Sequence, residues 1–290
     1  MAMMSGPESM LGDLRRLRWI HDRPVDASIV IPVNAKGDLE NALHLLDDLG
    51  RYAGPNAFEV LLVVNNFAEG QPPPAITTFQ AAGARVLSVS RVERRPGDAV
   101  PFSVRLLGIR NASSAWVISF DADCRIPDPT SLLDWYVIQG RRGTGLAYSH
   151  VDFYDLPPGL SIWVKIRLHH LARWTKRTIL GIPTARGSNY AVRRDLVVRL
   201  YDQGYIADEL NVGPVARSLG ERVAYTGDRS RVVLTSGRVY RPGWRRIISY
   251  FWYRLRYNLR VLPVRSNMAK RTGRDRDPAV RYDYTRRRDG

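Results

Sequence analysis

The sequence is short of several features that would otherwise define a class of protein. It contains one cysteine, Cys124, among 290 residues, which excludes an intramolecular disulfide framework and a zinc site built on several thiolates. No uncharged apolar run reaches the roughly 18 residues of a membrane-spanning helix, and the first residues lack the apolar core of a signal peptide. We therefore expect a cytoplasmic protein, either soluble or peripheral on the inner face of the membrane.

Acidic residues are also scarce, because 44 Lys and Arg stand against 28 Asp and Glu, for a net charge of +16. Most of this excess lies in residues 237–290, which hold 16 Lys and Arg and only 4 Asp. Such an excess indicates an anionic partner, either nucleic acid, anionic lipid or a phosphorylated small molecule. The rest of the chain is only mildly basic and shows no nucleic-acid-binding signature. We expect no specific nucleic acid, and keep a polyanion-binding protein as an alternative function.

What the sequence does contain is a regular alternation of short apolar runs and segments with helical spacing. Four runs are typical of buried strands: residues 28–33, 58–66, 84–90 and 115–120. Residues 145–154 predict a further strand nearer a sheet edge, and 222–227 and 230–236 a final pair of short strands. Helices are expected at 163–180 and around Pro214. This order predicts an α/β fold with a mixed, mostly parallel sheet flanked by helices.

The chain divides into three parts on composition. Residues 1–25 form an N-terminal extension, 26–236 the globular domain, and 237–290 a basic aromatic helix followed by a flexible tail. Within the last part, 244–262 mixes aromatics and arginines at helical spacing. Such a helix can lie on an anionic membrane. The equal alternative is that it docks on the core or on a second copy of the chain in a homodimer.

Two carboxylates, Asp121 and Asp123, follow the fourth apolar run directly. Ligands of open parallel sheets bind beyond the carboxyl ends of the strands, where Asn34, Asn65 and Asn66 are also expected. Carboxylates at i and i+2 can present oxygens to one Mn²⁺ or Mg²⁺ ion, which neutralises a departing diphosphate. The plainer alternative is a turn in which both carboxylates accept bonds from backbone amides.

Five segments in order extend this interpretation: SIVIPVN, EVLLVVNN, VRLLGIRNASSAWVISFDADC, GSNYAVRR and DELNV. Together they resemble the family 2 glycosyltransferases of GT-A fold, over about residues 26–236. The resemblance implies metal-dependent transfer of a sugar from a nucleotide-diphosphate donor (UDP-, dTDP- or GDP-sugar) to an acceptor hydroxyl, with inversion. It leaves open whether the acceptor is a glycan, a lipid-linked molecule or a small molecule. A nucleotidyltransferase of the same fold is the alternative enzyme.

The resemblance also assigns the donor site. Pro32, Val33 and Asn34 match the loop that packs on the nucleoside. Asn65 and Asn66 stand where the family has an aspartate that reads the base, and an amide can bond a base edge as donor and acceptor.

Further donor contacts follow from the same matches. Arg105 matches an arginine that approaches the diphosphate, although it could equally be an ordinary helix arginine. Asp121, Ala122 and Asp123 match the DxD motif, with Asp121 toward ribose or sugar and Asp123 toward the metal. The family's metal-binding histidine after the last strand is missing, and Arg238 lies there as a possible phosphate contact.

The acceptor side is assigned from the last two segments. Gly187, Ser188 and Asn189 match a loop whose small residues let a sugar approach the backbone. The catalytic base belongs to an acidic pair at the start of a late helix, here Asp208 and Glu209. Register favours Glu209, and Asp208 is the adjacent candidate, because an acceptor hydroxyl needs a base to remove its proton. Simple capping of the helix N-terminus is the alternative for both.

Overall fold

The structure is a computed structural model that describes residues 24–240 and Trp252. The predictions for the N-terminal extension, for the basic helix at 244–262 and for the tail beyond it lie outside the described residues. The main body contains a seven-stranded sheet in the order β3-β2-β1-β4-β7-β5-β8. Its strands are β1 (Ala27–Asn34), β2 (Phe58–Asn65), β3 (Arg85–Val89), β4 (Trp116–Ser119), β5 (Leu146–Ser149), β7 (Tyr190–Arg193) and β8 (Val223–Thr226).

The sheet is mixed and mostly parallel, as the sequence predicts. Strands β1 to β4 are parallel to one another, as are β5 and β8, and β7 runs antiparallel to both its neighbours. The near-continuous apolar runs form strands that are covered on both faces, since the side chains of Ile29, Val30 and Ile31 are all fully buried. Alternate residues therefore pack into two separate cores.

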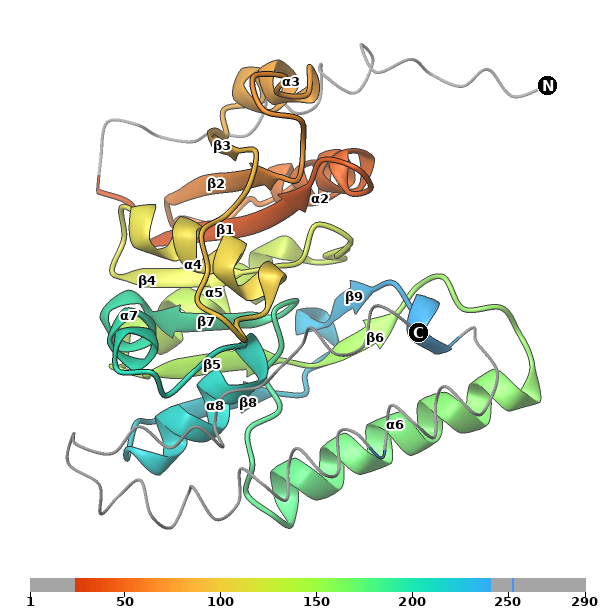
Figure 1. Ribbon diagram of the computed structural model, residues 1–290. Helices are drawn as coiled ribbons and strands as arrows, with labels where there is room; N and C mark the ends of the chain where they lie inside the picture. Colours follow the sequence, from red (N-terminus) through yellow and green to blue (C-terminus); the bar gives the residue numbers. More distant parts are fainter. Residues whose placement is uncertain (1–23, 241–251, 253–290) are drawn as a thin grey trace.

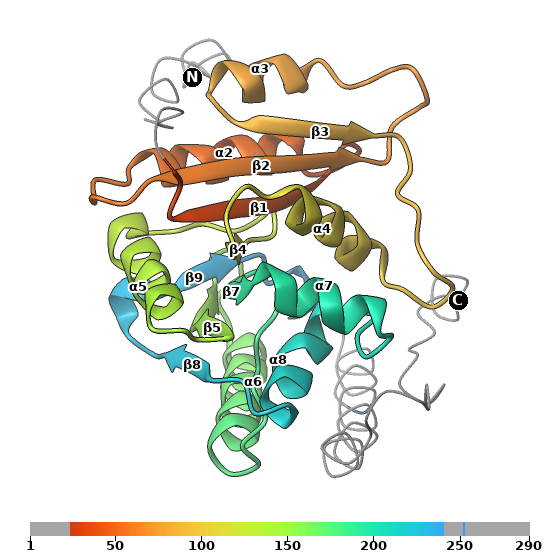
Figure 2. The ribbon, with the colours of Figure 1, turned by 90° about the vertical axis from the view of Figure 1, so that its left-hand side faces the viewer.

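Helices cover both faces of the sheet (Figures 1 and 2). Their bounds are α2 (Leu39–Gly50), α3 (Ala75–Ala81), α4 (Val100–Asn111), α5 (Pro129–Arg141), α6 (Leu160–Thr178), α7 (Arg194–Asp202) and α8 (Glu209–Ser218), with short 3₁₀ turns η1 (Arg229–Arg231) and η2 (Arg238–Tyr240). One apolar cluster joins α2, α3 and α5 to the sheet, and the other joins α4, α7 and α8. Helix α4 lies so close that a Cβ on Gly108 would overlap Val30 of β1.

One local prediction is wrong. Residues 145–154 form two strands, because the chain leaves the main sheet after Ser149, where Asn189 bonds its backbone. β5 lies next to the edge strand β8 of the main sheet, near the edge as expected, whereas β6 (Val151–Phe153) pairs with β9 (Val233–Thr235) in a second, two-stranded sheet. The two last strands, β8 and β9, consequently do not pair with each other. Neither α5 nor β7 was predicted.

Helix α6 has its polar side toward the protein. Lys165, His169 and Arg173, spaced one turn apart, are buried. The large apolar side chains point outward, and Trp163 is 56% exposed and Leu171 57% exposed. Despite this apolar face, no helix among the described residues is long and apolar enough to cross a membrane.

Candidate active site

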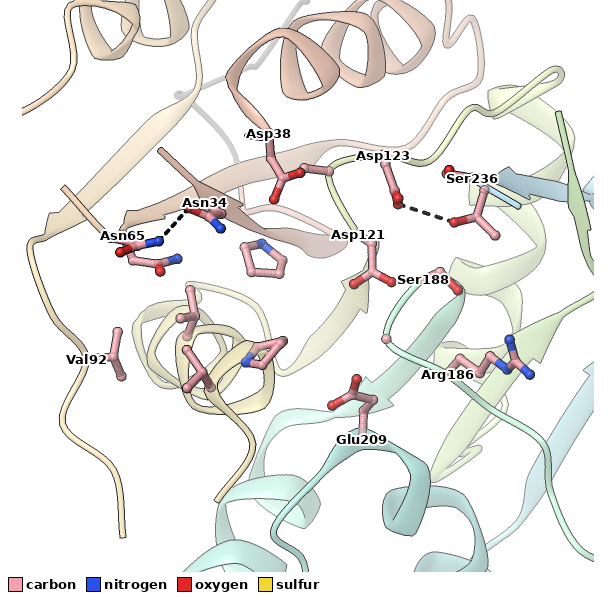
Figure 3. Close-up of a pocket in the computed structure, with 18 of the residues that line it drawn as sticks. Asn34, Asp38, Asn65, Val92, Asp121, Asp123, Arg186, Ser188, Glu209 and Ser236 are labelled. Carbon is pink, nitrogen blue, oxygen red and sulfur yellow. Dashed lines mark hydrogen bonds between the residues drawn. The ribbon is translucent and has the colours of Figure 1, made fainter. Parts of the chain in front are cut away.

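A cleft of about 760 Å³ opens at the carboxyl ends of β1, β2 and β4, and the first turn of α8 faces it (Figure 3). Its volume lies in the range of small-molecule sites. The cleft brings together ten of the residues assigned from the sequence: Pro32, Asn34, Asn65, Asn66, Asp121, Ala122, Asp123, Gly187, Ser188 and Glu209. Segments far apart in the chain thus meet where open α/β sheets bind their ligands.

The carboxylate of Asp123 lies deep in the cleft and is only 8% exposed. The Thr235 hydroxyl donates to its Oδ1 at 3.2 Å, and Arg238 Nη2 lies 3.4 Å from Oδ2. Burial, together with the neighbouring charges of Asp121 and Asp38, raises the pKa of Asp123 to about 6 against the opposing effect of Arg238. Two carboxylates that repel one another and both line the cleft have the chemistry that Mn²⁺ and Mg²⁺ bind.

The structure corrects the prediction that Arg105 approaches the diphosphate. Its side chain is fully buried and does not line the cleft. Instead it forms an ion pair with Asp121, lies 3.7 Å (Nη1 to Oε2) from Glu209, and donates from Nε to the Ser119 hydroxyl at 2.5 Å. Burial by itself lowers the pKa of Arg105, but the charges of Asp121 and Glu209 outweigh it and raise the pKa. Arg105 thus holds the carboxylates of Asp121 and Glu209 in place from the interior of the protein.

Gly187 is explained by the same arginine. A Cβ at this position would overlap the Arg105 guanidinium, and its carbonyl accepts a hydrogen bond from the Ser119 hydroxyl at 3.4 Å. A glycine is therefore required here because the Arg105 side chain occupies the space that a Cβ would fill. The sequence interpretation attributed the glycine to an approaching sugar instead. Ser188 lines the cleft beside it.

The acidic pair at the start of α8 is divided between two roles. Asp208 is fully buried, and its Oδ1 accepts a hydrogen bond from the backbone N–H of Asn211 at 3.0 Å, which caps the helix. It does not line the cleft, so the structure does not support it as the alternative base. Glu209 points into the cleft, on the side opposite Asp121 (Figure 3). Its Oε2 has no hydrogen-bond partner among the described residues.

The asparagines at the ends of β1 and β2 also differ from one another. Asn65 is buried, and its Nδ2 donates to the Val33 carbonyl at 3.1 Å, which ties β2 to β1. Asn66 has a positive φ of 65° and donates from Nδ2 to Asn34 Oδ1 at 3.0 Å. Asn34 and Asn66 therefore present amide groups at the cleft, whereas Val33 and Asn189 are fully buried and do not line it.

The sequence interpretation missed several residues that line the cleft: Asp38, Arg91, Arg94, Arg186 and Ser236. Asp38 lies at the start of α2, and Arg91 and Arg94 lie in the loop between β3 and α4. A cluster of basic residues in a loop that follows a parallel strand was a usable signal, because that loop must run along the carboxyl edge of the sheet.

The topology and the position of the cleft are those of a GT-A fold. The sequence matches no protein-family model and no curated protein. Among solved structures it is similar to the mannosyltransferase PcManGT of Pyrobaculum calidifontis, in complex with GDP-Man and Mn²⁺. The TM-score is 0.52 at 18% identity, over 94% of this chain and 76% of that one.

A second similar structure is residues 1–349 of TarS from S. aureus in complex with UDP. Its TM-score is 0.51 at 13% identity, over 85% of this chain and 67% of that one. A longer TarS chain is spanned to only 36% of its length. At these identities the comparisons establish a shared fold.

Proposed function

We propose that this protein is a metal-dependent glycosyltransferase that moves a sugar from a nucleotide-diphosphate donor to an acceptor hydroxyl. The observation that carries the proposal is the pair of facing carboxylate groups in one cleft. Asp121 and Asp123 stand on one side, Glu209 stands opposite, and Arg105 braces Asp121 and Glu209 from behind. The complexes of similar structures with GDP-Man and Mn²⁺ and with UDP support this choice.

On the donor side, Asn34 and Asn66 are the groups available to bond the base edge, since Asn65 is engaged with the backbone of β1. Asp123 and Asp121 would hold Mn²⁺ or Mg²⁺ together with the diphosphate. When bound, such an ion neutralises the charge that develops on the leaving diphosphate. Arg238, 66% exposed and beside Asp123, is placed to contact the same phosphates.

On the acceptor side, Glu209 is the proposed base. The acceptor oxygen attacks the anomeric carbon, the bond from that carbon to the diphosphate oxygen breaks, and the hydroxyl proton passes to the Glu209 carboxylate. In this proposal the acceptor attacks from the side of Glu209, which faces Asp121 across the cleft (Figure 3), and the diphosphate leaves on the side of Asp121 and Asp123. A single displacement of this kind inverts the anomeric carbon. Arg105 keeps Glu209 in position without entering the cleft.

The test combines binding with turnover. We expect one nucleoside diphosphate to raise the melting temperature of the full chain only with Mn²⁺ or Mg²⁺. With the matching donor, Glu209→Gln should lower kcat about 10²–10⁴-fold and leave nucleotide binding intact. Glu40→Gln, on the exposed side of α2, is the matched control and should retain the activity of the parent.

The same assay separates the alternatives. Full turnover by Asp123→Ala with saturating donor would refute the proposal. Release of pyrophosphate in place of the nucleoside diphosphate would identify a nucleotidyltransferase. Binding of DNA or RNA that weakens steeply with salt, without any nucleotide-dependent thermal shift, would identify a polyanion-binding protein.

A further inference from the structure

Outside the cleft, two histidines and an aspartate converge on one point. His150 follows β5, Asp152 lies in β6, and His170 lies on α6, whose buried residues are polar. One potential ligand atom from each residue lies within 4.8 Å of the other two. All three side chains are half-buried, and none of them lines the candidate active site. The proposed glycosyl transfer uses none of them.

Hydrogen bonding within the protein accounts for this arrangement only in part, since the Phe153 N–H donates to Asp152 Oδ1 at 2.9 Å. His170 Nε2 lies 3.5 Å from Asp152 Oδ1, which is long for a charge-assisted bond. The His150 and His170 rings stack at 5.1 Å between centroids, with 28° between their planes. His170 Nδ1 is buried and has no hydrogen-bond partner among the described residues. One unsatisfied buried nitrogen beside three converging ligand groups calls for a further partner, such as an ion.

We propose that His150, Asp152 and His170 form a second metal site, which takes Zn²⁺ or a similar transition-metal ion. Two imidazoles and a carboxylate suit Zn²⁺, Co²⁺, Ni²⁺ or Cu²⁺, whereas Mg²⁺ prefers oxygen ligands alone. The site therefore differs in chemistry from Asp121 and Asp123. Three protein ligands leave at least one position for water or an anion.

The surrounding charges affect which species fills that position. Arg173 is buried near His150, and the Arg177 guanidinium lies 3.7 Å from the centre of the Tyr225 ring, whose hydroxyl is 3.5 Å from His150 Nδ1. These arginines oppose a cation, and Asp152 is the carboxylate that attracts one. A hydroxide or other anion as the remaining ligand would offset the arginines.

A metal ion here would connect α6 to the two-stranded sheet. Asp152 pairs with Leu234 in the β6–β9 register, and the next residue of β9, Thr235, donates to Asp123. On the other strand, Phe153 lines the cleft and packs its ring against His169 and Tyr240. Metal binding should therefore make the wall of the cleft more rigid, and we expect it to raise the thermal stability of the whole chain.

The experiment titrates Zn²⁺ into the untagged, EDTA-treated full chain without nucleotide, and measures heat and the melting temperature. We expect one ion per chain, and at least about tenfold weaker binding in His170→Ala and Asp152→Asn. His44→Ala, which removes a histidine from α2, is the matched control and should bind like the parent. Co²⁺ should give a visible spectrum typical of imidazole ligands, and His170→Ala should lose it.

Two further variants keep the test decisive. If His170→Ala fails to fold by circular dichroism, His150→Gln replaces it. The double variant Asp121→Asn/Asp123→Asn should retain Zn²⁺ binding, because the second site does not use those carboxylates. The proposal is overturned if no Zn²⁺ binds, if His170→Ala and Asp152→Asn bind it as tightly as the parent, or if the double variant abolishes binding.

Discussion

The strands that form the donor side of the cleft and the helix α6 bury opposite kinds of side chain. In β1 and β2 most of the buried residues are aliphatic, and the polar Asn34 and Asn65 stand at the carboxyl ends, beside the cleft. In α6 the buried residues are Lys165, His169 and Arg173, and all the large apolar side chains with high exposure are leucines and tryptophans. Apolar burial thus stabilises the first region, whereas the second is attached through polar contacts.

This difference shows in how each region is held. Arg173 donates to the Thr184 carbonyl at 3.1 Å, Lys165 donates to the Tyr240 carbonyl at 3.2 Å, and the His169 ring meets the Tyr240 hydroxyl at 2.5 Å. Each polar contact contributes only about 1 kcal/mol net, less than one buried leucine. The strand core therefore sets the stability of the fold, and α6 is free to vary its outer face.

The largest effect should come from the strand core. Leu62 of β2 is fully buried, so Leu62→Ala should lower the free energy of unfolding by about 2–5 kcal/mol. Urea denaturation of the full chain followed by circular dichroism measures it. A loss of stability under about 1 kcal/mol would contradict the conclusion that the strand core sets the stability of the fold. A densely packed core relaxes little around a cavity, so the cavity should lower stability by more than that.

A smaller effect of opposite sign is expected at the carboxyl edge. Burial and the adjacent Asp121 raise the pKa of Asp123 from 3.8 to about 6. The folded state then holds this proton more tightly than the unfolded state, so stability is highest below the unfolded pKa and falls as pH rises to about 6. The measurement is the free energy of unfolding of Asp123→Asn minus that of the parent, without divalent metal. We expect this difference to be about 2 kcal/mol larger at pH 7.5 than at pH 4.

The comparison of two pH values is its own control, because effects of the substitution that do not involve the proton cancel. Equal stability differences at pH 4 and pH 7.5 would show that ionised Asp123 is not strained by its surroundings. The same variant should lose metal-dependent nucleotide binding, so that stability and function change in opposite directions at this residue.

In α6 we expect a gain from removing a buried charge. Burial, followed by the charge of Arg186, lowers the pKa of Arg173 to about 9, and its Nη1 has no hydrogen-bond partner among the described residues. An apolar side chain of similar length should fit with less desolvation cost. Arg173→Met should therefore raise the free energy of unfolding by about 1–2 kcal/mol near neutral pH. A decrease would show that Arg173 contributes more as a hydrogen-bond donor than its burial costs.

The same contrast explains what the sequence could predict. The strands β1 to β4 were placed from their apolar runs, and the cleft followed because parallel strands end at one edge. Helix α5 was missed although Asp128 and Pro129 are typical of a helix start, and Asp128 does accept a bond from the Ser131 N–H. The sequence therefore did contain a signal for the start of α5, and the interpretation overlooked it.

Other features had no local signal. The burial of Arg105 depends on Asp121 and Glu209, which lie 16 and 104 positions away in the chain. The convergence of His150, Asp152 and His170 depends on the break between β5 and β6, where the sequence suggested one continuous strand. The helical spacing of α6 was predicted, but spacing cannot tell which face turns inward when the polar side is the buried one.

The smallest effect is expected on the outer face of α6, and it tests the comparison most directly. Leu171 is 57% exposed, so little of its surface is removed from water by the described residues. Leu171→Ala should change the free energy of unfolding by less than about 0.5 kcal/mol, against several for the same substitution at Leu62.

Urea denaturation of the two leucine variants side by side, at one protein concentration, measures this difference. A loss at Leu171 of about 2 kcal/mol or more would mean that a part of the chain outside residues 24–240, or a second copy, covers the helix. Repeating the measurement over a hundredfold range of protein concentration distinguishes these two, since only association between chains depends on concentration.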